Sequence, residues 1–266
     1  MRYRIDMSYD GAPFCGWQIQ PSSPSVQEEL EKALGVLLKV TVGVVGAGRT
    51  DTGVSASRYV AHFDFAGPVD CGQLKYKLNA ILPHGIAIHG IAPAAPDFHA
   101  RFGAVSRQYQ YFLHRVKSPF LASRSYFYGY PDVDFDAMNR AAQALLGTHD
   151  FSCFEKAGGD NKTSVCTVTR ALWEPYTPDL AEPDCGASQP YWRFTIEADR
   201  FLRNMVRAIV GTLLEVGRGR RPEQEFASLV LAPRQETEGE SRKSMRSSAG
   251  ESVPGHALFL TDIRYQ

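Results

Sequence analysis

The 266-residue sequence lacks the features that define several classes of protein. No apolar run comes close to the ~18 residues that a membrane-spanning helix needs. The first segment, residues 1–9, mixes charged and apolar residues, so we do not expect a signal peptide there. The sequence therefore predicts a globular protein with no membrane partner.

Cysteine is scarce, and spacings typical of metal ligands are missing. The five cysteines are odd in number, widely spaced and without a CxxC pair, which argues against a disulfide scaffold and a zinc module. The seven histidines show no HExxH-like spacing. We therefore expect a reducing, cytoplasmic environment and no protein-bound metal.

The chain also has no net charge, with 29 basic and 29 acidic residues. Total charge therefore gives no support for a polyanionic partner. Two stretches are nevertheless locally basic: residues 101–124, which hold no acid, and residues 200–221, which hold six arginines. Charge sorted into patches can bind phosphate, although ordinary solvated surface charge is the alternative interpretation.

Hydrophobic periodicity predicts the same order of elements twice. The first half predicts strand, helix, strand, strand, helix, strand over residues 2–9, 26–39, 40–45, 59–65, 74–82 and 86–91. The second half predicts this order over residues 108–116, 135–146, 165–173, 191–198, 203–216 and 257–265, with an extra helix over 222–231. We expect an α+β protein of two tandem ferredoxin-like (RRM-like) βαββαβ halves with antiparallel sheets.

Capping residues, prolines and a polar segment predict where helices, domains and a loop begin or end. Ser25 and Asp134 are expected N-caps of the first helix in each half. Pro93 and Pro96 interrupt the pattern, which places the domain boundary after residue 96 and gives domains 1–96 and 97–266. Residues 235–255 are polar and predict a mobile loop before the last strand.

A glycine-rich loop over residues 46–55 is the strongest local indication of chemistry. It follows a predicted strand and places Arg49 and Asp51 among three glycines. Glycine lets backbone turn tightly and approach a ligand closely. The functional interpretation is an active-site loop that presents Arg49 and Asp51. An ordinary glycine-rich turn with an exposed Asp–Arg pair is the alternative.

The loop does not fit two familiar phosphate-binding motifs. A P-loop needs lysine where Val54 stands, and a dinucleotide fingerprint needs glycine where Asp51 stands. An aspartate beside an arginine suits other chemistry, because the arginine favours the ionised carboxylate. An ionised aspartate can attack an electrophilic carbon or take a proton.

Aromatic and basic residues supply a second indication. Tyr109 and Tyr111 share one face of a predicted strand with basic neighbours, an arrangement on which a flipped base could stack. A place in the core is at least as good an interpretation for Tyr111. Arg203, Asn204 and Arg207 on one predicted helix could contact phosphates, or the arginines could merely face solvent.

Taken together, these motifs resemble the TruA-type tRNA pseudouridine synthases. The segments that carry the resemblance occur in order along nearly the whole chain: Tyr9-Asp-Gly, Gly16-Trp-Gln, Ser25-Val-Gln-Glu-Glu-Leu, Gly48-Arg-Thr-Asp51 with Gly53-Val54, Asn79-Ala-Ile-Leu-Pro83, Phe98-His-Ala-Arg-Phe102, Arg107 with Tyr109 and Tyr111, Met205-Val-Arg-Ala-Ile-Val-Gly211, and Ala257-Leu-Phe-Leu260.

The resemblance implies a function. It implies isomerisation of uridine to pseudouridine at positions 38, 39 and 40 of the tRNA anticodon arm, by a homodimer without a cofactor. It implies that Asp51 is the catalytic aspartate, that Arg49 helps extrude the base, that Tyr109 lies against the base, and that Leu258 lines the pocket. Ser55 departs from the family pattern, which usually has histidine there.

The chemistry agrees with these residue types, and two rival functions remain. A stacked base must be flipped out before its glycosidic bond can be broken and rejoined through carbon. Asp51 could serve as nucleophile or as base for the ribose 2′ proton.

A non-catalytic RNA-binding protein is one rival interpretation, although no RNP1-like run occurs. A nucleotide-binding enzyme is the other, although the loop lacks the required lysine.

Overall fold

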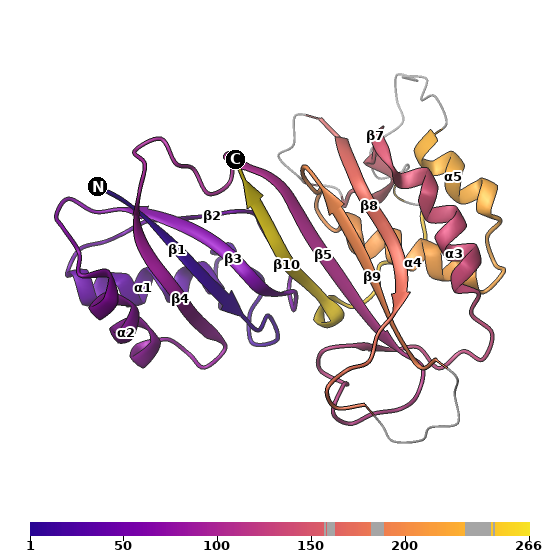
Figure 1. The fold of residues 1–266 in the computed structure, drawn as a ribbon, viewed down its shortest axis with the longest axis horizontal. Coiled ribbons are helices and arrows are strands. Elements are labelled where there is room, and N and C mark those ends of the chain that lie inside the picture. Colours follow the sequence, from indigo (N-terminus) through magenta and orange to yellow (C-terminus); the bar gives the residue numbers. More distant parts are fainter. Residues whose placement is uncertain (157, 159–162, 182–188, 232–245, 247) are drawn as a thin grey trace. The chain divides into compact units, whose positions relative to one another are not determined.

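The computed structural model describes residues 1–156, 158, 163–181, 189–231, 246 and 248–266. The chain forms two compact units, Met1–Arg107 with Phe259–Gln266, and Gln108–Leu258 (Figure 1). Both contain helices and mostly antiparallel strands, which confirms the predicted α+β class. The predicted division after residue 96 stays a prediction; the compact units change over at Arg107. Within the described residues, no helix is long and apolar enough to cross a membrane.

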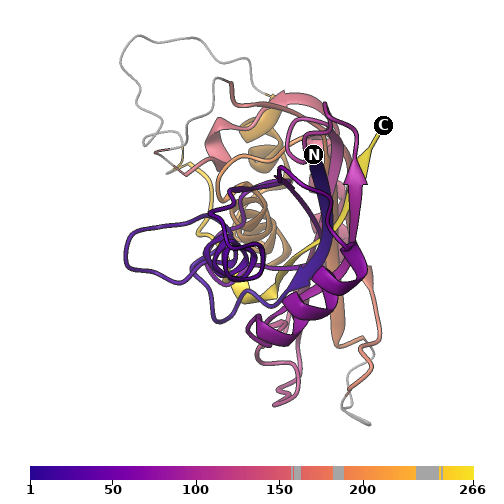
Figure 2. The ribbon, with the colours of Figure 1, turned by 90° about the vertical axis from the view of Figure 1, so that its left-hand side faces the viewer.

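The first unit is a sheet with helices α1 and α2 on one face (Figure 2). Its strands run in the order β4-β1-β3-β10, with β2 also paired to β3. The pairs within this unit are antiparallel except for β10 on β3, which is parallel with Phe259 opposite Ser55. Its elements are β1 (Arg2–Tyr9), α1 (Val26–Leu38), β2 (Val44–Gly46), β3 (Ser55–Asp64), α2 (Cys71–Ile81), β4 (Ile86–Ala94) and β10 (Leu258–Tyr265).

Local sequence explains most of these elements. Alternate residues of β1, from Tyr3 to Tyr9, are buried, as the period of two predicts. Ser25 caps α1 as predicted, because its hydroxyl accepts the backbone N–H of Glu28 at 3.3 Å. Helix α2 begins earlier than predicted because Asp70 caps it. The Asp70 carboxylate accepts the backbone N–H of Gln73 at 3.0 Å.

Three strand predictions in this unit are wrong in their bounds. Strand β2 covers Val44–Gly46 rather than residues 40–45. Strand β3 begins at Ser55, the last residue of the glycine loop, rather than at Tyr59. Strand β4 continues past Pro93 to Ala94 instead of stopping before it. Pro93 lies opposite Tyr3 in this strand, and β4 ends the strand order, the edge position at which sheets tolerate proline.

The second unit pairs its strands in the order β5-β9-β8-β7, with the short β6 parallel to β5. Helices α3, α4 and α5 contact one another, and α3 packs on β8 while α5 packs on β7. Its elements are β5 (Ala104–His114), β6 (Tyr126–Phe127), α3 (Phe135–Ala142), β7 (Gly147–Asp150), β8 (Val165–Pro175), β9 (Tyr191–Ala198), α4 (Met205–Gly217) and α5 (Glu223–Leu231).

Helix α4 is the core of this unit, since nearly all of its residues are buried. It begins at Met205, so the prediction that Arg203 and Asn204 lie on this helix is wrong. Asn204 is the N-cap and has a left-handed backbone with φ 64°, which ends helical geometry there. The predicted helix over 135–146 is likewise shorter and ends in a 3₁₀ turn, Gln143–Leu145.

The predicted mobile loop over residues 235–255 is only partly covered. Residues 235–245 and 247 lie outside the described residues. Arg246 and residues 248–254 are described, and several of these lie against helix α4. That end of the segment therefore has defined contacts.

Candidate active site

The glycine loop connects β2 to β3 in the first unit. Arg49 is exposed and Asp51 is half-buried, while Thr50 between them is only 8% exposed. The Val54 N–H donates to the Asp51 carbonyl at 3.1 Å, which closes a turn just after the aspartate. Gly53 lies inside that turn with φ 77°, a backbone conformation that glycine adopts at no steric cost. The loop thus presents Asp51 from a defined turn.

A second loop, residues 10–17, lies against the glycine loop. The Trp17 N–H donates to the Thr50 carbonyl at 3.3 Å, and the Gly53 N–H donates to the Phe14 carbonyl at 3.4 Å. At Gly16, with φ 94°, an added Cβ would lie 2.3 Å from the Thr50 carbonyl oxygen. Any other residue at Gly16 would therefore push the two loops apart.

Three buried aromatic rings lie under the glycine loop. Trp17 and Tyr59 have centroids 4.2 Å apart, and Tyr9 lies 5.3 Å from Tyr59. The Tyr59 hydroxyl donates to the Gly48 carbonyl. The Tyr9 hydroxyl shares a hydrogen bond of 2.9 Å with the Thr50 hydroxyl. The aromatic residues of the Tyr9-Asp-Gly and Gly16-Trp-Gln segments therefore hold the loop that carries Asp51.

Arg107 also holds the glycine loop in place. The sequence indicates this arginine only as a basic neighbour of Tyr109. Its guanidinium donates to the Ala47 carbonyl at 3.0 Å, and also to the carbonyls of Ala104 and Arg101. Ala47 is the first residue of the glycine loop after the end of β2, so this arginine fixes the position where the loop leaves the strand. Residues 60 positions apart make this contact, and no local pattern could have revealed it.

Tyr109 and Tyr111 lie on the buried face of β5, as predicted. Tyr109 is 9% exposed and meets Phe201 edge-to-face, with ring centroids 5.0 Å apart. Tyr111 is fully buried, and burial raises the pKa of its phenol above the usual value. Among the described residues, its hydroxyl has no hydrogen-bond partner. The core interpretation therefore fits Tyr111, and Tyr109 remains the candidate for contact with a base.

The two arginines predicted to contact phosphate have different surroundings. The Arg203 carbonyl, just before helix α4, accepts the Lys156 N–H at 3.0 Å. Arg207 lies on the helix, and its Nε donates to the Val253 carbonyl at 2.7 Å. At least one donor of Arg207 therefore binds the chain itself rather than facing solvent.

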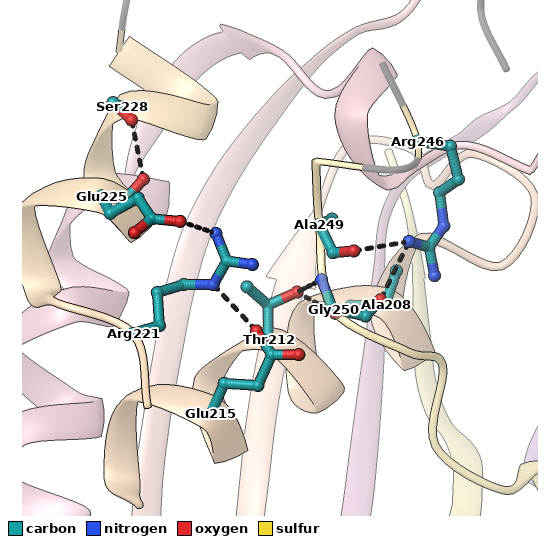
Figure 3. A network of polar contacts seen from close by, with 9 residues as sticks. All are labelled: Ala208, Thr212, Glu215, Arg221, Glu225, Ser228, Arg246, Ala249 and Gly250. Atoms are coloured by element: carbon teal, nitrogen blue, oxygen red, sulfur yellow. Dashed lines mark hydrogen bonds and ion pairs between the residues drawn. The ribbon is translucent and has the colours of Figure 1, made fainter. Parts of the chain in front are cut away.

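Residues 248–254, which we call the strap, lie on helix α4 and lead to Leu258. The Gly250 N–H donates to the Thr212 hydroxyl at 3.0 Å, and that hydroxyl donates to the Ala208 carbonyl at 2.7 Å (Figure 3). Arg246 donates to the carbonyls of Ala249 and Gly250 (Figure 3). These contacts fix the segment that precedes Leu258.

Leu258 is 4% exposed and is the first residue of β10. The structure thus groups the predicted site residues into two sets. Asp51 and Arg49 belong to the first compact unit, and Tyr109, Arg203, Arg207 and Leu258 belong to the second. Within the part of the chain that the structure describes, no group of three or more His, Cys, Asp or Glu side chains is arranged to hold a metal ion.

Ser55, which departs from the resembled family, has a clear contact. Its buried hydroxyl accepts the Gly11 N–H at 2.9 Å. An added Cβ at Gly11 would lie 2.2 Å from the Val54 carbonyl oxygen, so the two segments approach as closely as backbone allows. Ser55 therefore joins the end of the glycine loop to the Tyr9-Asp-Gly segment.

Comparison with known proteins identifies the relatives of this chain. A family model described as tRNA pseudouridine synthase matches residues 141–266. The chain is 46% identical to the tRNA pseudouridine synthase A of Parabacteroides distasonis, over 99% of this chain and 96% of that protein. It is 39% identical to the tRNA pseudouridine synthase A of Bacillus subtilis, over 100% of this chain and 99% of that protein. The chain therefore belongs to the tRNA pseudouridine synthase A family, a family of isomerases.

Proposed function

We propose that this protein isomerises uridine to pseudouridine in tRNA, at positions 38, 39 and 40 of the anticodon stem-loop. The observation that carries the proposal is identity of 39% to 46% with tRNA pseudouridine synthases A along the full chain. The glycine loop supports it, because a half-buried carboxylate in a firmly held turn is suited to act on one bound nucleoside.

The proposed reaction begins with a flipped base. The target uridine leaves the stack, with Arg49 assisting the extrusion. Asp51 then either attacks the ribose C1′ as nucleophile or takes the ribose 2′ proton, and the N1–C1′ bond breaks with its electron pair going to the uracil. The detached uracil rotates and bonds to C1′ through its C5 carbon, which releases Asp51 from C1′ or lets the 2′ proton return. The C5 proton is then removed and N1 takes up a proton. No redox step occurs in this sequence, and we propose that no cofactor is needed.

We also propose substrate-binding roles for residues of the second unit. Tyr109 lies against the base, and either stacks on it or takes the C5 proton. Leu258 lines the base pocket. Arg203 and Arg207 bind phosphates of the tRNA. We further propose that both halves are ferredoxin-like and that the working form is a cytoplasmic homodimer.

The proposal is tested by mapping pseudouridine at single-base resolution in tRNA treated with the purified protein. We expect new pseudouridine at positions 38 to 40 only. Asp51→Asn keeps the size of the side chain but removes the charge, and should abolish the product while thermal stability changes by a few degrees at most. Loss of a catalytic nucleophile or base typically costs several orders of magnitude in rate. Pseudouridine elsewhere in tRNA would overturn the positions, and a tenth of wild-type activity in Asp51→Ala would overturn the role of Asp51.

A further inference from the structure

Thr50 stands between the two residues proposed for chemistry and faces away from solvent. Arg49 on one side is exposed and Asp51 on the other is half-buried, whereas Thr50 is 8% exposed. Its hydroxyl is paired with the Tyr9 hydroxyl at 2.9 Å in a buried setting. Through this buried hydroxyl, the residue that precedes Asp51 connects the glycine loop to strand β1.

The backbone of Thr50 is held by the same segment. Its carbonyl accepts the Trp17 N–H at 3.3 Å, and Gly16 leaves room for that approach only because it has no Cβ. Past the turn, the Ser55 hydroxyl accepts the Gly11 N–H at 2.9 Å. Both ends of the turn that carries Asp51 are thus bonded to residues 9–17.

The hydroxyl pair adds a side-chain bond at Thr50 to the hydrogen bonds that already hold the backbone of the loop. Packing of the Trp17 and Tyr59 rings is not directional. The Tyr59 hydroxyl also donates to the Gly48 carbonyl, and the Trp17 N–H donates to the Thr50 carbonyl. A hydrogen bond weakens steeply as its angle departs from linear, so it fixes orientation as well as distance. The Tyr9–Thr50 bond therefore restricts rotation of the backbone on which Asp51 stands.

We propose that Tyr9 and Thr50 are positioning residues, whose buried hydroxyl pair holds the Asp51 carboxylate in the orientation needed for reaction. This inference rests on the proposed function of Asp51. In this proposal both hydroxyls act through Asp51 rather than on the substrate. Small displacements of a reacting group are costly, with about 100-fold lost for a misplacement of 1 Å.

The experiment compares variants that remove one hydroxyl and preserve shape. Tyr9→Phe and Thr50→Val each delete one partner of the pair, and Thr50→Ser restores a hydroxyl at the same place. Tyr3→Phe is the matched control: Tyr3 lies on the same strand, is 1% exposed, and its hydroxyl also bonds a loop, at Gly67 and Val69. For each variant we would measure the single-turnover rate at saturating tRNA, the Kd for tRNA, and Tm.

We expect Tyr9→Phe and Thr50→Val each to lower the single-turnover rate by about 10- to 100-fold. The Kd for tRNA should stay within about twofold, and the double variant should be no slower than the worse single variant. Thr50→Ser should recover most of the rate. Tyr3→Phe should lower Tm by a similar amount and leave the rate unchanged.

The results separate this inference from the function on which it rests. A wild-type rate in Tyr9→Phe, or equal losses in Tyr9→Phe and Tyr3→Phe, would overturn the positioning role while Asp51→Asn remained inactive. Activity in Asp51→Asn would instead overturn the role of the aspartate. Weaker tRNA binding in Thr50→Val without a change in rate would also overturn the proposal, because it would place Thr50 in recognition rather than positioning.

Discussion

His62 shows how burial of one residue makes stability depend on pH. It lies on β3, is 4% exposed, and its Nδ1 accepts the Ala100 N–H at 3.2 Å. Burial, with smaller contributions from the positive charges of Arg2 and His99, lowers the pKa of His62 from 6.5 to about 4. Protonation would also remove the lone pair that accepts the Ala100 N–H.

The sign of the effect follows from proton binding. Above pH 6.5, the His62 ring is neutral in both folded and unfolded states. Between pH 6.5 and about 4, the unfolded chain binds a proton that the folded protein does not, so folding stability falls as pH falls. We expect Tm to drop from pH 7.5 to pH 5, and to drop less in His62→Gln.

Exposed His84 supplies the control for this measurement. His84→Gln should give a Tm profile parallel to that of the wild type. Equal slopes for His62→Gln and the wild type would show that another group is responsible. Burial also lowers the pKa of His99 and of His114, so part of the slope should persist in every variant.

For individual residues, the sequence predicted the glycine loop but not the contacts that hold this loop in place. Asp51 and Arg49 are conspicuous because glycines surround them, and this composition is local. Tyr9 and Thr50 are 41 positions apart, so their bond depends on how β1 and the loop are brought together. Periodicity cannot predict such a contact between distant residues.

The strap on helix α4 gives a prediction at the scale of elements. At Gly211, an added Cβ would lie 1.8 Å from the Glu251 carbonyl oxygen, so the strap and helix meet backbone to backbone. Replacing glycine by alanine inside a helix ordinarily stabilises by about 1 kcal/mol. We expect Gly211→Ala to do the opposite and destabilise by about 1–3 kcal/mol, measured by chemical unfolding, because the strap must move.

Gly35 in α1 is the matched control for this substitution. Its added Cβ would meet only the Val40 carbonyl oxygen, at an ordinary 3.6 Å. Gly35→Ala should therefore leave stability unchanged or raise it slightly. Should both alanine variants be stabilised, the close approach of the strap to α4 would be wrong.

Helices and strands could be predicted from the sequence where a local rule fixes the residue at which they begin. Ser25 and Asp134 cap their helices because each side chain reaches a backbone N–H three residues later. The start of α4 was not predictable from periodicity, because the left-handed Asn204 breaks a pattern that otherwise continues. Short strands such as β7 contain too few residues for a pattern.

Binding of the whole molecule to tRNA should depend on salt, since neutralised phosphates release counterions. The structure distinguishes basic residues that are held in ion pairs from basic residues that are exposed to solvent. Arg221 forms ion pairs with Glu215 and Glu225, whereas Lys117 and Arg220 are exposed. We expect Lys117→Gln with Arg220→Gln to weaken binding and to lower the slope of log Kd against log salt by about 0.7–0.9 for each phosphate that is no longer neutralised.

Arg221→Gln is the control for that experiment. It should lower Tm, because two acidic partners lose their ion pair, and it should leave the salt slope unchanged. If the Lys117 and Arg220 substitutions leave the slope unchanged, these side chains do not bind the RNA backbone.

The pairing of β10 with β3 also dictates when the protein can complete its folding during synthesis. Residues 259–266 belong to the first unit but are translated after the whole second unit. At ~5–20 residues per second, the ribosome needs roughly 8–30 s to make the residues between. During that time Ser55 and Ala56 lack their β10 partners, and unpaired strand edges favour aggregation. The strand that follows the Asp51 loop is thus among the last parts of a nascent chain to be protected, so we expect newly made chains to depend on chaperones most during this interval.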